Sequence, residues 1–214
     1  MKTLFIAAKY KGEVKIDPKA FEKLPDRVGL VSSVQFLDRL KDIKKDFEKY
    51  GKKAIIGGQI LGCDASAAKN IEKKVDAFLY IGDGAFHPIG IALKTKKAVF
   101  TYDPADNVFD KISDDEILKY KNRQKGAFLK YLSSTNIGII VSTKPGQEKL
   151  KAALKLKDHL ERKGKNAYIF TADNIDLNEL EDFPFIECWV NTACPRLRDD
   201  FENTAKTIIN LEEI

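Results

Sequence analysis

RVGLVSSVQFLDRLKDIKKDFEKYGKKAIIGGQ, at residues 27–59, has the same order of features as NIGIIVSTKPGQEKLKAALKLKDHLERKGKNAYIFTADN, at residues 136–174. Each stretch begins with an apolar run rich in Val, Leu and Ile, passes through Ser or Thr into a lysine-rich segment, and ends in a second apolar run. Apolar runs without polar alternation are typical of strands covered on both faces of a parallel sheet. The repeat therefore predicts two similar strand–helix–strand units.

The lysine-rich segments have the spacing of amphipathic helices. Apolar residues recur every three or four positions along residues 35–50 and again along residues 147–163, which places them on one helix face. Gly51 and Gly164 follow these segments and suit the left-handed backbone that ends a helix. Alternating strands and helices indicate βαβ units with right-handed crossovers.

The remainder of the chain continues this alternation. We predict strands at residues 3–7, 28–33, 53–58, 77–82, 98–103, 137–143, 166–172 and 185–191. The predicted fold class is α/β, with two similar small domains whose mainly parallel sheets are flanked by helices. We assign residues 1–103 to the first domain and 115–214 to the second, which a helix over 115–132 opens. The acidic segment DPADNVFDKISDDE (103–116) is the expected linker.

Composition excludes several classes of protein. The 214 residues are 43% hydrophobic and 32% charged, which is ordinary for a globular protein, and no apolar run approaches the ~20 residues of a membrane span. The net charge of +5 comes from lysines interleaved with acidic residues, a pattern that favours solvated helix faces over a nucleic-acid partner. Three cysteines do not make a disulfide framework. We expect a reducing, cytoplasmic setting without a membrane partner.

Two cysteines follow predicted strands. Cys63 lies in GGQILGCDAS (57–66), just past one strand, and Cys194 lies in VNTACPRL (190–197), just past another. Parallel α/β sheets bind ligands beyond the carboxyl ends of their strands, and Arg196 favours the thiolate form of Cys194 that metals bind. Cys63 is a candidate ligand or a buried small residue. Cys188 lies inside a predicted strand, roughly 20 Å from Cys194 if the chain is extended, so we expect it in the core.

Other polar candidates follow the strands of the first domain. GDGAFHPIG (82–90) is a turn that leads into a helix, and Gly82 and Gly84 could present main-chain N–H groups to a carboxylate or phosphate. His87, in the same turn, is either a ligand contact or a structural residue. Asp103 ends another strand, where it accepts a hydrogen bond from an amine or caps the turn.

Several of these motifs, in this order and spacing, resemble the diphthamide synthesis family. They are GQILGCDASAAKN (58–70), IGDGAFHPIGIAL (81–93) with YDP (102–104), IIVSTKPGQ (139–147) and FPFIECWVNTACPRL (183–197). The resemblance implies transfer of a 3-amino-3-carboxypropyl group from S-adenosylmethionine to a histidine of translation elongation factor two. It also implies that S-adenosylmethionine is cleaved at a reduced 4Fe–4S cluster, which leaves a radical on the transferred fragment.

The resemblance assigns site residues and leaves one ligand unassigned. Cys63 matches the cysteine of the family's second domain and Cys194 that of its third, so both are expected metal ligands. We expect S-adenosylmethionine against Gln59, the turn from Gly82 to Gly84, His87 and Asp103. MKTLFIAAKYKGEV (1–14) resembles the start of the family's second domain, so the first domain and its cysteine have no counterpart here.

These matches predict a partial or split enzyme. Its third thiolate would come from a further subunit that supplies the missing domain, or from a homodimer. The principal alternative is a non-catalytic module of the same family that binds a cluster or an adenosyl ligand. A third hypothesis is a generic nucleotide-binding protein whose cysteines are structural.

Overall fold

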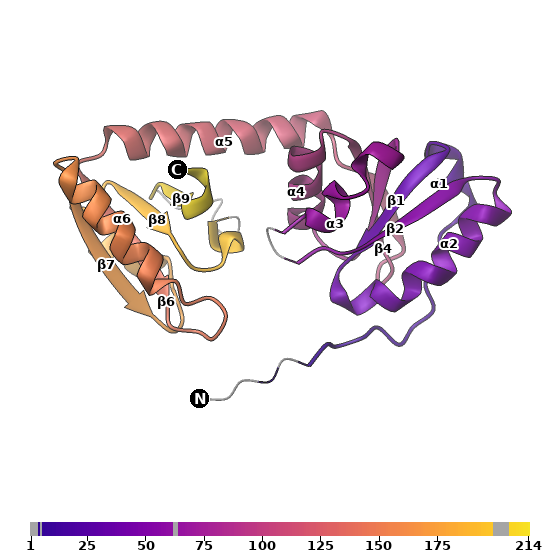
Figure 1. Ribbon diagram of the computed structural model, residues 1–214, viewed down its shortest axis with the longest axis horizontal. Helices are drawn as coiled ribbons and strands as arrows, with labels where there is room; N and C mark the ends of the chain where they lie inside the picture. The colour runs from indigo at the N-terminus through magenta and orange to yellow at the C-terminus, as the bar shows by residue number, and fades with distance from the viewer. Residues whose placement is uncertain (1–3, 5, 62–63, 199–205) are drawn as a thin grey trace. The chain divides into compact units, whose positions relative to one another are not determined.

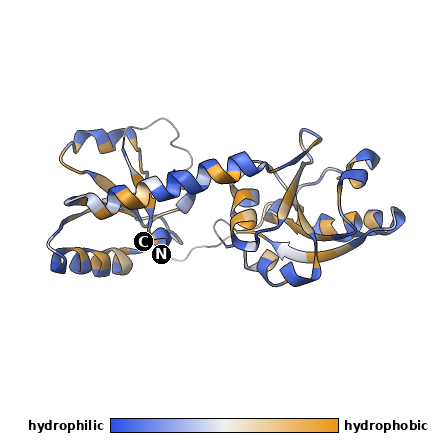
Figure 2. Ribbon diagram, turned by 90° about the horizontal axis from the view of Figure 1, so that it is seen from above, coloured by the Kyte–Doolittle hydropathy of each residue, from blue (hydrophilic) through white to orange (hydrophobic). Residues whose placement is uncertain are grey.

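A computed structural model describes residues 4, 6–61, 64–198 and 206–214. The chain forms two compact units, Met1–Leu118 and Lys119–Ile214 (Figure 1). Both units are built from mostly parallel sheets with flanking helices, which confirms the predicted α/β class. In Figure 2 the helices alternate between hydrophilic and hydrophobic residues along their length. This is expected for helices that pack one face against a sheet and expose the other.

Unit 1 has a sheet in the order β2–β1–β3–β4–β5. Its strands are β1 Arg27–Ser32, β2 Lys53–Gln59, β3 Ala77–Ile81, β4 Ala98–Asp103 and β5 Val108–Lys111. All neighbouring pairs are parallel except β4 with β5. Every residue of β3 is buried, which explains why this strand has no polar alternation in the sequence.

Helices cover both faces of this sheet. They are α1 Pro18–Lys23, the 3₁₀ turn Val34–Arg39, α2 Leu40–Lys49, α3 Ser66–Lys69, the 3₁₀ turn Glu72–Lys74 and α4 Phe86–Thr95. Phe21 of α1 and Phe47 of α2 pack with Leu30 and Leu79 in one core. Ala68 of α3 and Ile91 of α4 pack in a second core, which lies on the opposite face of the sheet. Unit 1 is therefore a three-layer α/β unit.

Unit 2 repeats this plan with an all-parallel sheet in the order β7–β6–β8–β9. Its strands are β6 Asn136–Ser142, β7 Asn166–Ala172, β8 Cys188–Asn191 and β9 Ile208–Asn210. Its helices are α6 Leu150–Arg162 and most of α5 Asp114–Ser133, with 3₁₀ turns at Asn178–Asp182, Pro195–Arg198 and Leu211–Glu213. Residues of α5 and α6 fill the core on one face of the sheet. Trp189 anchors the core on the other face.

The first strand of each unit carries a glycine opposite a buried aromatic ring. Gly29 of β1 is paired with Phe78 of β3, and Gly138 of β6 is paired with Trp189 of β8. A Cβ atom on Gly29 would lie 2.6 Å from Cε1 of Phe78, and one on Gly138 would lie 2.4 Å from Cε3 of Trp189. Each glycine therefore makes room for the ring beside it.

Two expectations about chain organisation were wrong. Within residues 3–7, Leu4 and Ile6 are 81% and 83% exposed and belong to no strand. Their composition favours a strand, but a strand needs a hydrogen-bonded neighbour. The expected linker, 103–116, contains β5, because the chain turns back at Asn107, whose φ is 54°. Asn tolerates this left-handed conformation, and the ring of Phe109 then stacks on Phe100 with centroids 5.8 Å apart.

The charged surface agrees with the solvated-face interpretation of the lysines. On α2, Lys45 pairs with Asp42 and Lys49 with Asp46, three residues apart in each case. Pairs of this kind occur between exposed neighbours on one helix. No helix in the described part of the chain is both long enough and apolar enough to cross a bilayer.

Candidate cofactor sites at the strand ends

Each sheet has a point where the chain reverses the direction in which it adds strands. In unit 1 the chain runs from β1 to β2 on one side and then to β3 on the other, and in unit 2 it does the same with β6, β7 and β8. Ligands of open α/β sheets bind at such reversal points, beyond the carboxyl ends of the strands. The ends of β1 and β3, and those of β6 and β8, are therefore where a cofactor is expected.

Three of the predicted site residues of unit 1 lie at or just past the carboxyl ends of strands β2, β3 and β4. Gln59 of β2 is paired with Ser32 of β1, which is also paired with Ile81 of β3. Gly82 donates its main-chain N–H to the carbonyl of Tyr102 at 3.0 Å, next to Asp103. With adjacent strands about 4.8 Å apart, Gln59 and Asp103 are separated by roughly 14 Å along one edge. The sheet thus brings Gln59, Gly82 and Asp103 to one edge, as the sequence predicts.

Two serine hydroxyls at this edge have no hydrogen-bond partner among the residues that the structure describes. The Oγ atoms of Ser32 and Ser33 are buried and have no hydrogen-bond partner within the described residues. Burying a hydroxyl without a hydrogen bond is unfavourable, and such groups call for a specific explanation. Because they lie at the reversal point between β1 and β3, a polar ligand group is the partner that best accounts for them.

His87 is held by a tyrosine beneath the glycine turn. Its Nδ1 lies 3.1 Å from the hydroxyl of Tyr80, and the two rings stack with centroids 5.6 Å apart. Gly82 has a φ of 149°, and a Cβ there would lie 2.7 Å from the same hydroxyl. Gly82 therefore leaves room for the pair of Tyr80 and His87, and this pair favours a structural role for His87.

Gly84 and Asp103 shape their turns in different ways. Gly84 has a φ of 68°, and a Cβ atom added there would meet no other atom within 4 Å, so backbone conformation rather than crowding requires it. The Oδ1 of Asp103 accepts a hydrogen bond from the main-chain N–H of Ala105 at 2.8 Å. One of the two expectations for Asp103, capping the turn, is therefore what its Oδ1 does.

Cys63 lies outside the described residues, and only its neighbours can be placed. Ile60 donates its N–H to the carbonyl of Ser32 at 2.8 Å, and Leu61 and Asp64 exchange two main-chain hydrogen bonds. The pKa of Asp64 is lowered because its carboxylate accepts hydrogen bonds from the main chain and hydroxyl of Ser66. The segment that contains Cys63 therefore leaves β2 beside the end of β1. Its pairing with Cys194 stays a prediction.

Cys194 lies three residues beyond the end of β8, at the reversal point of unit 2. Its thiol is free and the residue is half-buried. Thr192 ties the turn to β6, because both its N–H and its hydroxyl donate to the carbonyl of Ile140, at 3.0 and 2.7 Å. A fixed turn with a free thiol suits a metal ligand.

Cys188 lies in the core, as expected. It is fully buried in β8 beside Ile137 and Val190, and burial raises the pKa of its thiol to about 12. A thiol that stays protonated is a poor metal ligand. Within the described residues, no group of three His, Cys, Asp or Glu side chains is arranged to hold a metal ion. The described residues therefore fit one thiolate ligand of a cluster, at Cys194.

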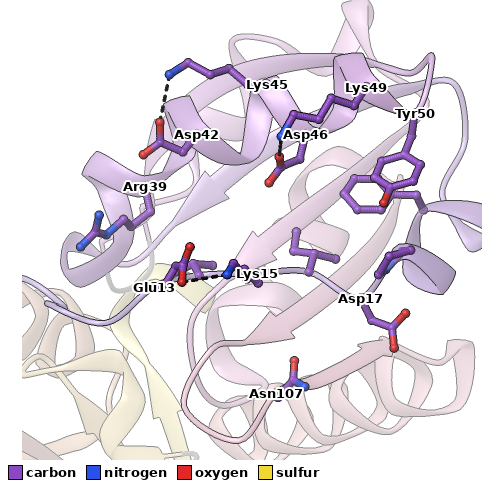
Figure 3. Close-up of a pocket in the computed structure, with 14 residues that line it drawn as sticks. Glu13, Lys15, Asp17, Arg39, Asp42, Lys45, Asp46, Lys49, Tyr50 and Asn107 are labelled. Atoms are coloured by element: carbon purple, nitrogen blue, oxygen red, sulfur yellow. Dashed lines mark hydrogen bonds and ion pairs between the residues drawn. The ribbon is translucent and has the colours of Figure 1, made fainter.

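A surface cavity elsewhere in unit 1 contains none of the predicted site residues. It measures about 800 Å³ and lies between residues 13–18 and α2 (Figure 3). The charged side chains around it largely pair with one another, such as Lys15 with Glu13 at 2.9 Å and Lys49 with Asp46 at 2.7 Å. Because these charges are already paired, they offer a ligand little net attraction.

Sequence reasoning missed the site residues Ser32, Ser33 and Tyr80. It also missed Asn191 and Asn210, whose side chains hydrogen-bond to each other at 2.8 Å and to the main chain around Cys194. A signal for the serines was present, since the first apolar run of each repeat ends in Ser or Thr, at Ser32–Ser33 and at Ser142–Thr143. The two pairs differ in the structure, because the Oγ of Ser142 accepts a hydrogen bond from Lys144 N at 3.2 Å. No local pattern marks the two asparagines, because their pairing depends on the register of β8 with β9.

Comparison with known proteins gives consistent matches over the whole chain. The sequence profile of the family described as "Putative diphthamide synthesis protein" matches residues 1–214. The 2-(3-amino-3-carboxypropyl)histidine synthase of Pyrococcus horikoshii is 31% identical over 95% of this chain and 58% of its own length. The synthase of the same name from Methanocaldococcus jannaschii is 30% identical over 100% of this chain and 61% of its own length.

The structural comparison agrees. The crystal structure of Dph2 from Pyrococcus horikoshii with a 4Fe–4S cluster has a TM-score of 0.77 and 29% identity, covering 91% of this chain and 58% of that one. A second structure of that protein has a TM-score of 0.79, covering 94% of this chain and 61% of that one. The chain thus spans about three fifths of the length of these relatives.

Proposed function

The chain belongs to the diphthamide synthesis protein family, and we propose that it provides two α/β domains of an iron–sulfur 3-amino-3-carboxypropyl transferase. In this proposal S-adenosylmethionine is the donor and a histidine of translation elongation factor two is the acceptor. The reaction takes place in the cytoplasm, where thiols stay reduced. The proposal is carried by the free, half-buried thiol of Cys194 at the reversal point of its sheet.

Cys194 and Cys63 are the proposed ligands of a 4Fe–4S cluster. When bound, such a cluster supplies one-electron chemistry for cleavage of a sulfonium. The protein contributes the thiolate of Cys194 from a fixed turn and excludes Cys188, whose thiol stays protonated in the core. A cluster of this family needs a third thiolate, which we propose comes from further protein: a separate subunit, a second copy or additional residues of the same polypeptide.

The proposed S-adenosylmethionine site is the edge formed by Gln59, the turn from Gly82 to Gly84, His87 and Asp103. The buried hydroxyls of Ser32 and Ser33 support it, because they need polar partners at that edge. The N–H groups of the turn and of the start of α4 can bind a carboxylate. The Asp103 carboxylate would favour a nearby cation.

The alternative is a module that binds a cluster or an adenosyl ligand without transferring anything. It shares every feature of the site above, so the structure fits both. The two differ in one outcome, which is modification of elongation factor two once the third thiolate is supplied.

The test begins with anaerobic reconstitution of the chain, alone and with a candidate protein that carries the missing domain. We expect stable iron and sulfide only in the mixture, and loss of iron in Cys63→Ala and Cys194→Ala but not in the matched control Cys188→Ala. Addition of elongation factor two, S-adenosylmethionine and a reductant should then give a modified histidine by mass spectrometry. Iron binding without modification would support the non-catalytic module. Retention of iron after Cys194→Ala would refute the assigned ligand.

A further inference from the structure

Two buried asparagines join the carboxyl ends of β8 and β9. Asn191 and Asn210 are paired residues of the parallel ladder and are 1% and 4% exposed. The Nδ2 of Asn191 donates a hydrogen bond to the Oδ1 of Asn210 at 2.8 Å. Amide groups are costly to bury unless all their hydrogen bonds are formed. Their presence in place of apolar side chains therefore calls for a specific role.

The two amides hold the main chain on both sides of Cys194. Asn191 donates from Nδ2 to the carbonyl of Cys194 at 2.9 Å and accepts at Oδ1 from the N–H of Ala193 at 2.9 Å. Asn210 donates from Nδ2 to the carbonyl of Pro195 at 3.2 Å. Three consecutive residues of the turn are thus bound to side chains that the sheet register fixes.

Glu213, near the C-terminus, holds Asn210 and the end of the turn in place. Glu213 accepts a hydrogen bond from the main-chain N–H of Asn210 at 3.2 Å, and another from Nε2 of Gln124 at 2.7 Å. The nearly buried guanidinium of Arg198, four residues after Cys194, also pairs with Glu213, its Nη1 lying 2.6 Å from Oε1. The turn is therefore bound at its start by the asparagines and at its end by Glu213.

We propose that Asn191 and Asn210 are positioning residues for the Cys194 thiolate, an inference that rests on the proposed role of Cys194 as a metal ligand. Groups that hydrogen-bond around a metal ligand orient it and tune its affinity. Two neutral amides suit this purpose, because they fix the turn without adding negative charge beside a thiolate. The carbonyl of Cys194 also accepts the N–H of Leu197 at 3.0 Å, so its lone pairs are engaged by donors of the turn itself.

The test measures how readily the Cys194 thiol reacts in the full 214-residue chain. We would compare wild type with Asn191→Ala and Asn210→Ala, follow alkylation by iodoacetamide, and locate the label on Cys194 by peptide mass spectrometry. One hydrogen bond corresponds to roughly a fivefold change in an equilibrium. Asn191→Ala removes two bonds to the turn, one donated to Cys194 and one accepted from Ala193, and should accelerate Cys194 alkylation by roughly 25-fold. Asn210→Ala removes the one bond donated to Pro195 and should accelerate it by roughly fivefold.

The matched control is Gly138→Ala, which overpacks Trp189 of the same strand β8 but removes no hydrogen bond to the turn. It should leave the alkylation rate of Cys194 unchanged. The comparison is made under conditions in which tryptophan fluorescence shows that Gly138→Ala and Asn191→Ala are both folded. After reconstitution, Asn191→Ala should also lose iron faster than Gly138→Ala.

Equal alkylation rates in wild type, Asn191→Ala and Asn210→Ala would overturn the positioning role. So would an acceleration that Gly138→Ala reproduces. If Asn191→Ala does not fold, Asn210→Ala alone decides the question. Because alkylation needs no cluster, this result is independent of whether wild type binds iron, which tests the proposed function separately.

Discussion

Substitution of Gly138 by Ala should destabilise unit 2 by about 2 kcal/mol. The added Cβ would lie 2.4 and 2.5 Å from Cε3 and Cζ3 of Trp189. The indole cannot withdraw, because it is fully buried and packs against Phe170 and Phe183 with centroids 4.7 and 6.1 Å away. Overpacking costs about 1–3 kcal/mol, and contacts this short against a ring that cannot withdraw place the cost at the upper end, about 3 kcal/mol. The lower chain entropy of Ala offsets about 0.5–1 kcal/mol of it.

The measurement uses the sole tryptophan of the sequence as its probe. Trp189 lies in unit 2, so its fluorescence during urea titration follows the unfolding of that unit alone. For a unit of this size the free energy of unfolding falls by about 1–2 kcal/mol per molar urea. The urea concentration at the midpoint of unfolding should therefore fall by about 1–2 M in Gly138→Ala.

The control for this prediction is Gly126→Ala, in the exposed interior of α5, where no atom lies within 4 Å of the added Cβ. It should raise the stability of the unit by about 0.5–1 kcal/mol, because Ala favours helix. An unchanged or raised midpoint for Gly138→Ala would show that the Trp189 ring has room to move, and would refute the packing argument.

The remaining predictions concern the same unit and unit 1. Burial raises the pKa of Cys188 to about 12, so the unfolded chain ionises first and wild-type stability should fall above about pH 8.5 by about 1 kcal/mol per pH unit. Urea titrations at pH 8 and 10 should show this loss, and Cys188→Ala should lack it. Glu213→Ala leaves the buried Arg198 without its carboxylate and should destabilise unit 2 by about 3 kcal/mol in the fluorescence assay; a loss below about 1 kcal/mol would mean that water replaces the pair. In unit 1, Gly51→Ala should cost about 1 kcal/mol in the circular-dichroism transition, because its φ is 69°, and an unchanged transition would contradict the assigned cap.

Most strands of the fold could be predicted from runs of apolar residues in the sequence. The strands expected at 53–58, 98–103 and 166–172 correspond to β2, β4 and β7, because parallel strands covered on both faces leave a continuous apolar signature. The short strands β5 and β9 escaped prediction. Three to four residues are too few for a periodic pattern. The edge strand β5 is also largely exposed, whereas β9 is buried and was missed because of its length alone.

The candidate site was predictable where it depends on strand order and unpredictable where it depends on register. Gln59, Gly82 and Asp103 lie at one edge because any parallel sheet collects the ends of its strands there. The pairing of Asn191 with Asn210 depends on how β8 lies against β9, and β9 was not foreseen. Likewise, the contact of His87 with Tyr80 crosses the turn at Gly82 and has no spacing that marks it in sequence.

The different environments of Cys188 and Cys194 also decide how this protein would respond to peroxide. Oxidation to sulfenic acid proceeds through the thiolate and needs access, and the thiol of Cys188 has neither. Oxidant reaching unit 2 would therefore react at Cys194, six residues along, where the thiol is half-buried. In unit 2, oxidation is thus directed away from the hydrophobic core to Cys194, where a sulfenic acid can be reversed by a thiol reductant.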